Sequence, residues 1–205
     1  MTQRISKAIF ALLAIIIGLY PSIYFFLQVR NIGLLSTKTN ELLTNIYWNI
    51  GFYTHIIFGG ISLLVGWMQF NKRLLHRKPS LHRLIGKIYA ISVFLSGFAG
   101  IGIGFTATGG FIASLGFISL GIVWVATTLL AYLEIRNGKI EQHRKLMIYS
   151  YAACFAAVTL RIWLPLLMIT LGDYLFAYRI VAWLCWVPNI IAAYFIVKTL
   201  KPYNA

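Results

Sequence analysis

Long apolar runs dominate this chain and alternate with short polar connections. The runs lie near 8–28, 46–70, 84–107, 111–135, 147–170 and 177–199. A helix that crosses about 30 Å of hydrocarbon at 1.5 Å per residue needs about 20 apolar residues, so each run predicts one transmembrane helix. The pattern therefore predicts an all-α fold: a polytopic membrane helical bundle with six transmembrane helices, forming a single integral membrane domain over 1–205.

The basic residues predict the orientation of the bundle, because cytoplasmic loops are enriched in Lys and Arg. With the N-terminus inside, only Arg30, Lys38 and Arg179 fall outside, and Arg161 lies within a span. The other 14 of the 18 basic residues fall on or near the inner face: Arg4, Lys7, Lys72, Arg73, Arg77, Lys78, Arg83, Lys87, Arg136, Lys139, Arg144, Lys145, Lys198 and Lys201. Both termini are therefore expected in the cytoplasm.

Composition narrows the possible functions. Charged residues make up 11% of the chain and hydrophobic residues 60%, which excludes an ordinary soluble protein and leaves no room for a soluble catalytic domain. The net charge of +14 follows from the orientation rule, so it predicts contact with anionic lipids at the cytoplasmic face and no nucleic-acid binding. The four acidic residues all fall at or beyond helix ends, which argues against a hydrolase or protease.

Two polar residues are expected inside the membrane, in the outer half of the bundle. His55 lies on a stripe of small residues with Gly51 and Gly59, and Arg161 lies on a similar stripe with Ala157 and Pro165. Such stripes mark helix contacts, so both side chains are expected to face the protein interior at a common depth. They predict either a buried ligand site formed by His55 and Arg161, or structural hydrogen bonds only.

Prolines are expected to disturb the last two spans. Pro165 has no N–H for the carbonyl of Arg161, and Pro188 likewise frees the carbonyl of Leu184, so we expect a kink at each. The acceptors expected for Arg161 are that freed carbonyl, His55, Thr159, Asn189 and Asp173.

His82 and His143 form a second pair of candidate residues. Each is expected at the cytoplasmic end of a helix that runs toward the outer face. Their local sequences are similar, since both begin His-Arg and reach Ile-Tyr a few residues later. Two histidines at equal depth could clamp a b-type haem from both sides, with Arg83, Arg144, Lys87 or Lys145 near the propionates. The alternative is that both are interfacial histidines in basic loops. No metal other than this haem iron is expected, and His76, with no predicted helix to orient it, is left out.

The chain resembles a family of bacterial membrane proteins designated domain of unknown function 2306. The match covers a core of about 50–170, from the second to the fifth helix. The residues that carry it are His55, Gly59, Gly60, Gly66, Gln69, Phe70, Leu81, His82, Arg83, Gly86, Tyr89, Gly109, Gly110, Trp124, His143, Arg144, Thr159, Leu160, Arg161 and Pro165. The resemblance implies a multi-pass protein of the bacterial inner membrane and brings no established activity.

The chain is also similar to the six-helix transmembrane cytochromes b that transfer electrons from ascorbate-like donors to ferric acceptors. In this resemblance His82 and His143 correspond to the cytoplasmic haem pair, and His55 to one ligand of the other haem. Residues 111–135 contain no histidine to complete that second pair, so at most one haem is implied.

Three functions remain open on the sequence. The first is a b-type haem protein that transfers electrons, with His82, His143 and His55 as candidate haem ligands. Such a protein would be a membrane oxidoreductase. The second is a small transporter or permease that uses His55 and Arg161. The third is an accessory subunit or assembly factor of a membrane complex, with a partner protein or a second copy as its contact. No catalytic residue can be assigned.

Overall fold

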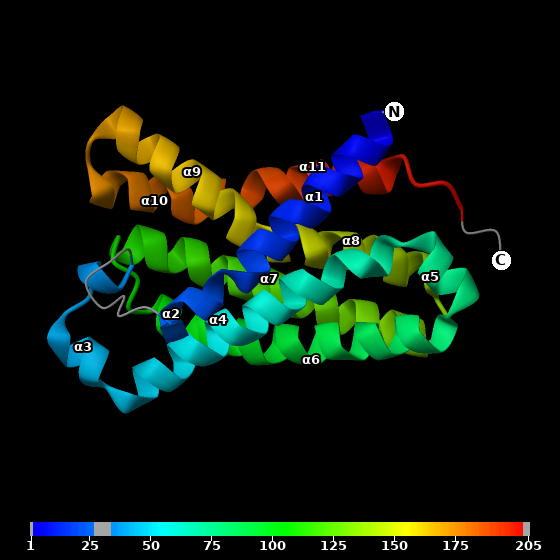
Figure 1. Cartoon of the computed structure of the whole chain (residues 1–205), viewed down its shortest axis with the longest axis horizontal. Coiled ribbons are helices and arrows are strands. Elements are labelled where there is room, and N and C mark those ends of the chain that lie inside the picture. The colour runs from blue at the N-terminus through cyan, green and yellow to red at the C-terminus, as the bar shows by residue number, and fades with distance from the viewer. Residues whose placement is uncertain (1, 27–33, 203–205) are drawn as a thin grey trace. The chain divides into compact units, whose positions relative to one another are not determined.

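The computed structural model describes residues 2–26 and 34–202, and there the chain forms helices and connections without β-strands (Figure 1). Five helical stretches in this part are long and apolar enough to cross a membrane: Ile46–Phe70, Pro79–Gly104, Phe111–Arg136, Ile140–Leu171 and Tyr174–Lys198. They coincide with five of the six predicted runs, which confirms an all-α membrane fold. The apolar helical stretch near the N-terminus, Ala8–Ser22, is shorter. The end of that first run and Arg30 lie outside the described residues.

The chain divides into two compact units, Met1–Ala99 and Gly100–Ala205. The first holds α1 (Thr2–Leu19), η1 (Tyr20–Ser22), α2 (Ile23–Phe26), η3 (Leu35–Thr37), α3 (Asn40–Thr44), α4 (Ile46–Gly66), η4 (Trp67–Phe70), α5 (Lys72–Arg77) and most of α6 (Pro79–Gly104). The second holds the end of α6, α7 (Phe111–Arg136), α8 (Ile140–Cys154), α9 (Ala156–Leu171), α10 (Tyr174–Leu184) and α11 (Val187–Lys198).

In the first unit, α1 packs against α4 at a pair of glycines. A Cβ atom added to Gly60 would lie 2.6 Å from the carbonyl oxygen of Gly18, so the two helix backbones touch. Lipid gives helices little hydrophobic reason to associate, and close backbone approach supplies van der Waals contact instead. The small residues therefore determine where these helices meet.

A short helix, α5, lies in the connection before α6, where the sequence analysis expects none. It begins because the side chain of Asn71 accepts hydrogen bonds from the backbone N–H groups of Arg73 (2.9 Å) and Leu74 (3.4 Å). His76 therefore does lie on a helix, contrary to expectation, and its side chain is exposed.

In the second unit, α7 packs against α8 and α10, α9 packs against α10, and α11 packs against α8. Figure 1 shows α9 and α10 side by side, joined by the turn at Gly172 and Asp173. A Cβ atom on Gly116 would lie 2.8 Å from the carbonyl oxygen of Ala182, so α7 and α10 also touch at backbone level.

A tight turn joins α6 to α7 at Gly109 and Gly110. Gly110 has φ of 71°, a conformation that costs glycine little and other residues much. The carbonyl oxygen of Gly109 accepts a hydrogen bond of 2.9 Å from Nε of Arg179, on α10. This arginine thus fastens the turn to the next hairpin of the same unit.

The last two membrane-spanning stretches are each interrupted midway. α8 ends at Cys154 and α9 begins at Ala156, while α10 ends at Leu184 and α11 begins at Val187. The second interruption confirms the kink expected at Pro188. The first lies at Phe155, ten residues before Pro165, and was not expected; α9 continues through Pro165, where the kink remains a prediction.

Candidate functional site

His143 lies in the first turn of α8, with its ring held by the preceding helix. The connection between α7 and α8 is closed by backbone bonds at Asn137, Gly138 and Lys139, and Gly138 has φ of 76°. This tight reversal brings the Nδ1 atom of His143 to 2.8 Å from the carbonyl oxygen of Ala131. A carbonyl oxygen only accepts, so Nδ1 carries the hydrogen, and in the neutral ring Nε2 keeps its lone pair.

His55 is held in the same way in the first unit. Its Nδ1 lies 2.9 Å from the carbonyl oxygen of Ser96, on α6, and the Ser96 hydroxyl donates to the carbonyl oxygen of His55 at 2.8 Å. Ser96 is fully buried, and a Cβ atom on Gly59 would lie 3.1 Å from its Oγ. The predicted small-residue face of α4 therefore does contain His55, and Nδ1 of His55 is again the donor.

His82 lies in the first turn of α6, near the end of the preceding span. Its carbonyl oxygen accepts a hydrogen bond of 3.3 Å from Nε2 of Gln69, on η4. Gly86, one turn later, lies beside that glutamine, because a Cβ atom there would be in ordinary contact with the Oε1 atom of Gln69, at 3.5 Å. Gln69, His82 and Gly86, which all carry the family resemblance, therefore meet in one place.

Arg161 lies on α9 and folds back along its own helix. Its Nη1 donates a hydrogen bond of 2.8 Å to the carbonyl oxygen of Ala157, an acceptor that the sequence analysis does not name. Asp173, one of the acceptors considered, instead caps α10 by accepting from the N–H of Phe176 at 2.9 Å. The guanidinium thus lies toward the interruption at Phe155.

The structure adds a polar cluster at the two helix interruptions that the sequence analysis did not assemble. Asn189, just after Pro188, donates through Nδ2 to the carbonyl oxygens of Cys185 (3.0 Å) and Ala152 (3.3 Å) and to Oγ1 of Thr159 (3.1 Å). The Thr159 hydroxyl also donates to the carbonyl of Cys185. The interruptions of both spans are thereby joined. In the sequence, only the Pro188-Asn189 pair pointed to this cluster. Nothing in the sequence marks Thr159 or the backbone carbonyls as the partners of Asn189.

The structure does not test the two predicted pairs. His55 and His82 belong to the first unit, and His143 and Arg161 belong to the second, so both the haem pair and the His55–Arg161 pair remain predictions. Among residues 2–26 and 34–202 no group of three or more His, Cys, Asp or Glu side chains is placed to hold a metal ion.

The comparisons with known proteins agree with a membrane protein and add no activity. No curated protein and no solved structure matches the chain significantly. One family model matches residues 52–197, which extends the resemblance seen in the sequence into the last span. This match covers well over half of the chain, and the chain therefore belongs to the family described as predicted membrane protein (DUF2306).

Proposed function

We propose that this membrane protein binds a b-type haem through His143 and takes part in electron transfer. The observation that supports the proposal is the orientation of the His143 ring. Its Nδ1–H donates to the carbonyl of Ala131 at 2.8 Å, and the remaining nitrogen has no partner among the described residues. Metal-binding histidines usually donate their second ring N–H to a carbonyl or carboxylate, which sets the tautomer and the ring plane.

The protein would contribute by holding the His143 ring in the tautomer and orientation that a haem ligand needs. The Ala131 carbonyl keeps the hydrogen on Nδ1, so that Nε2 presents a lone pair without a rearrangement of α7 or α8. A haem bound there would supply one-electron redox chemistry. The second ligand expected from the sequence is His82, and His55 shares the same ring arrangement as His143.

An absorption spectrum of the full chain, purified from haem-replete cells, tests the proposal. We expect a Soret band, with α-bands that sharpen on reduction. His143→Ala and His82→Ala should each lose haem, because one strong axial bond disappears. His76→Ala, which changes an exposed histidine on α5, is the matched control and should retain it.

A colourless protein that also fails to take up haem on reconstitution would contradict the proposal. So would a His143→Ala variant with the wild-type spectrum. Thermal unfolding of each variant, followed beside the spectrum, separates loss of a ligand from loss of the fold.

We propose a second candidate function, a permease for a small anion, on a different observation. The interruptions of α8–α9 and α10–α11 are joined through Thr159 and Asn189, and the Arg161 guanidinium folds back toward them. Paired interruptions of this kind occur at substrate sites of transporters. An arginine inside a span is costly, which favours a functional role.

Thermal shifts of the full chain with inorganic phosphate, sulfate or a short carboxylate test this candidate. At least one anion should raise the unfolding temperature. Arg161→Lys should abolish that shift, because a planar fork is replaced by a point charge. Arg136→Lys, at an exposed arginine on α7, should leave it unchanged. Absence of any shift, or an equal shift in Arg161→Lys, would exclude the anion site.

We further propose that the protein lies in the bacterial inner membrane, with six spans and both termini in the cytoplasm. The distribution of basic residues supports this orientation. The N-terminal stretch Ala8–Ser22 would then begin the first span.

A further inference from the structure

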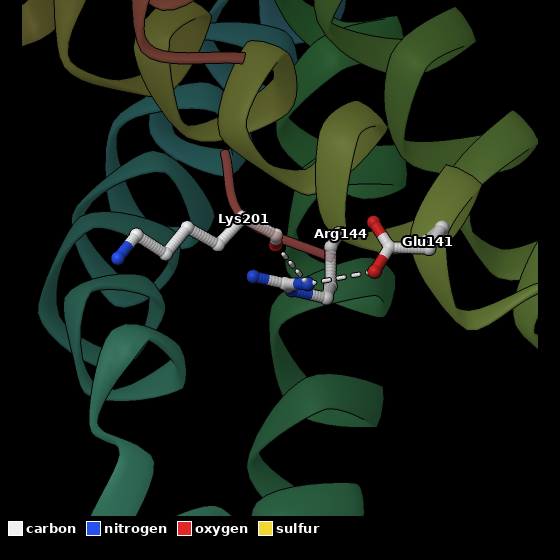
Figure 2. A network of polar contacts seen from close by, with 3 residues as sticks. All are labelled: Glu141, Arg144 and Lys201. Carbon is white, nitrogen blue, oxygen red and sulfur yellow. Dashed lines mark hydrogen bonds and ion pairs between the residues drawn. The ribbon is translucent and has the colours of Figure 1, made fainter. Parts of the chain in front are cut away.

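A cavity of about 490 Å³ opens in the second unit where α8 begins and α11 ends. It is lined by Glu141, Lys145, Val197, Lys198, Leu200 and Pro202. The segment that follows α11 closes one side, because Nη1 of Arg144 donates to the carbonyl oxygen of Lys201 at 3.4 Å (Figure 2). The cavity is thus formed by the start of α8, the end of α11 and the segment 199–202, which we call the strap.

The lining of this cavity carries two lysines and one acid, so positive charge is in excess. Figure 2 shows the Arg144 guanidinium between the Glu141 carboxylate, at 3.0 Å, and the Lys201 carbonyl. The acid is therefore already neutralised by Arg144. The ammonium group of Lys198 lies 5.1 Å from the ring centre of Tyr194. Lys145 has no hydrogen-bond or ion-pair partner in the part of the chain that the structure describes, so its charge is available to a ligand.

The rest of the lining is apolar, and the cavity lies at the level where spans end. Val197 and Leu200 supply hydrocarbon beside the two lysines. A ligand that matches this surface carries a negative charge next to aliphatic chain. Phospholipid phosphates lie at this level, and basic pockets between transmembrane helices on the cytoplasmic side bind anionic headgroups.

We propose that this cavity is a binding site for the headgroup of an anionic phospholipid. Lys145 and Lys198 contact the phosphate, and Val197 and Leu200 contact the first carbons of the acyl chains. Arg144 acts as a positioning residue, because it holds both Glu141 and the strap at Lys201.

Native mass spectrometry of the full chain in detergent tests the site. The protein is offered an equal mixture of phosphatidylglycerol and phosphatidylcholine with the same acyl chains. Wild type should retain phosphatidylglycerol selectively. The selectivity should fall about fivefold for each lysine removed, so that Lys145→Ala with Lys198→Ala loses about 25-fold. The control pair Arg136→Ala with Lys139→Ala removes two cations from exposed positions on and just after α7 and should keep the selectivity.

Two results would overturn the proposal. One is equal phosphatidylglycerol retention by wild type and the double lysine variant. The other is displacement of the lipid from wild type by millimolar inorganic phosphate, which would identify a site for the free anion. If the alanine variant does not fold, Lys145→Gln with Lys198→Gln keeps the side-chain length and must show the same loss.

Discussion

Asn189 is the residue whose replacement should report most directly on the helix interruptions. Its amide donates to two carbonyl oxygens and to Thr159, all from inside the spans. Asn189→Leu should lower the unfolding free energy by about 0.6 to 1.7 kcal/mol, which are the mean and the largest values measured for hydrogen bonds between membrane helices. Asn189→Asp should cost more, because a carboxylate would face carbonyl oxygens and carry charge into the span. Unfolding followed in detergent measures both.

Thiol labelling gives an independent readout of the same change. Cys185 is fully buried beside Asn189, and Cys154 is buried near the other interruption. In a Cys154→Ser background, Asn189→Leu should speed the labelling of Cys185, because a restraint on its backbone carbonyl is removed. An unchanged labelling rate together with unchanged stability would show that the cluster does not hold the interruptions closed.

At the residue scale, sequence predicted where polar groups lie better than it predicted their partners. His55 was placed correctly on a small-residue face, because the four-residue spacing of glycines and serines is visible in the chain. Its acceptor, the carbonyl of Ser96, and the acceptor of Arg161, the carbonyl of Ala157, are backbone groups. Every residue carries such a carbonyl, so nothing in the sequence singles these out.

The helix contacts lead to a prediction about two glycines in different surroundings. Gly60→Ala should destabilise the first unit by about 1 to 3 kcal/mol, because its Cβ would lie 2.6 Å from the backbone oxygen of Gly18, which cannot move aside cheaply. Gly102→Ala, on α6, meets nothing within 4 Å and should be neutral or stabilising by up to about 1 kcal/mol. Parallel thermal unfolding of the two variants checks this. Equal effects would mean that α1 and α4 do not meet at this pair.

At the element scale, hydropathy was a good guide to spans and a poor one to their internal structure. The bilayer demands a long apolar run for each span, so five runs could be recognised, with their ends placed to within seven residues. The interruption near Pro188 was also predictable, since proline removes a donor. Phe155 carries no such signal, because it is not a proline and has its backbone N–H. Its φ of −67° and ψ of −10° are also common values for any residue.

For the whole molecule, the testable quantity is the side of the membrane on which each connection lies. Reporter fusions or cysteine labels after residues 40, 75, 109, 140 and 174 should give outside, inside, outside, inside, outside. The expectation follows from the excess of Lys and Arg in the connections 71–83 and 136–146. A cytoplasmic signal at residue 109 would contradict it, because the turn at Gly109 and Gly110 would then lie on the wrong side.

The stretch Ile140–Leu171 is longer than the membrane is thick. Its 32 residues correspond to about 48 Å of helix, against about 30 Å of hydrocarbon. A helix tilted by about 20° would still leave about three turns beyond the hydrocarbon, and the polar end of α8, with His143 and Lys145, is the end suited to the headgroup layer. Hydrophobic mismatch then acts on this end of the molecule first. In bilayers of shorter acyl chains this end of α8 should lie farther from the hydrocarbon, and in bilayers of longer chains it should lie deeper. Membrane thickness would then control how exposed His143 is to the aqueous phase.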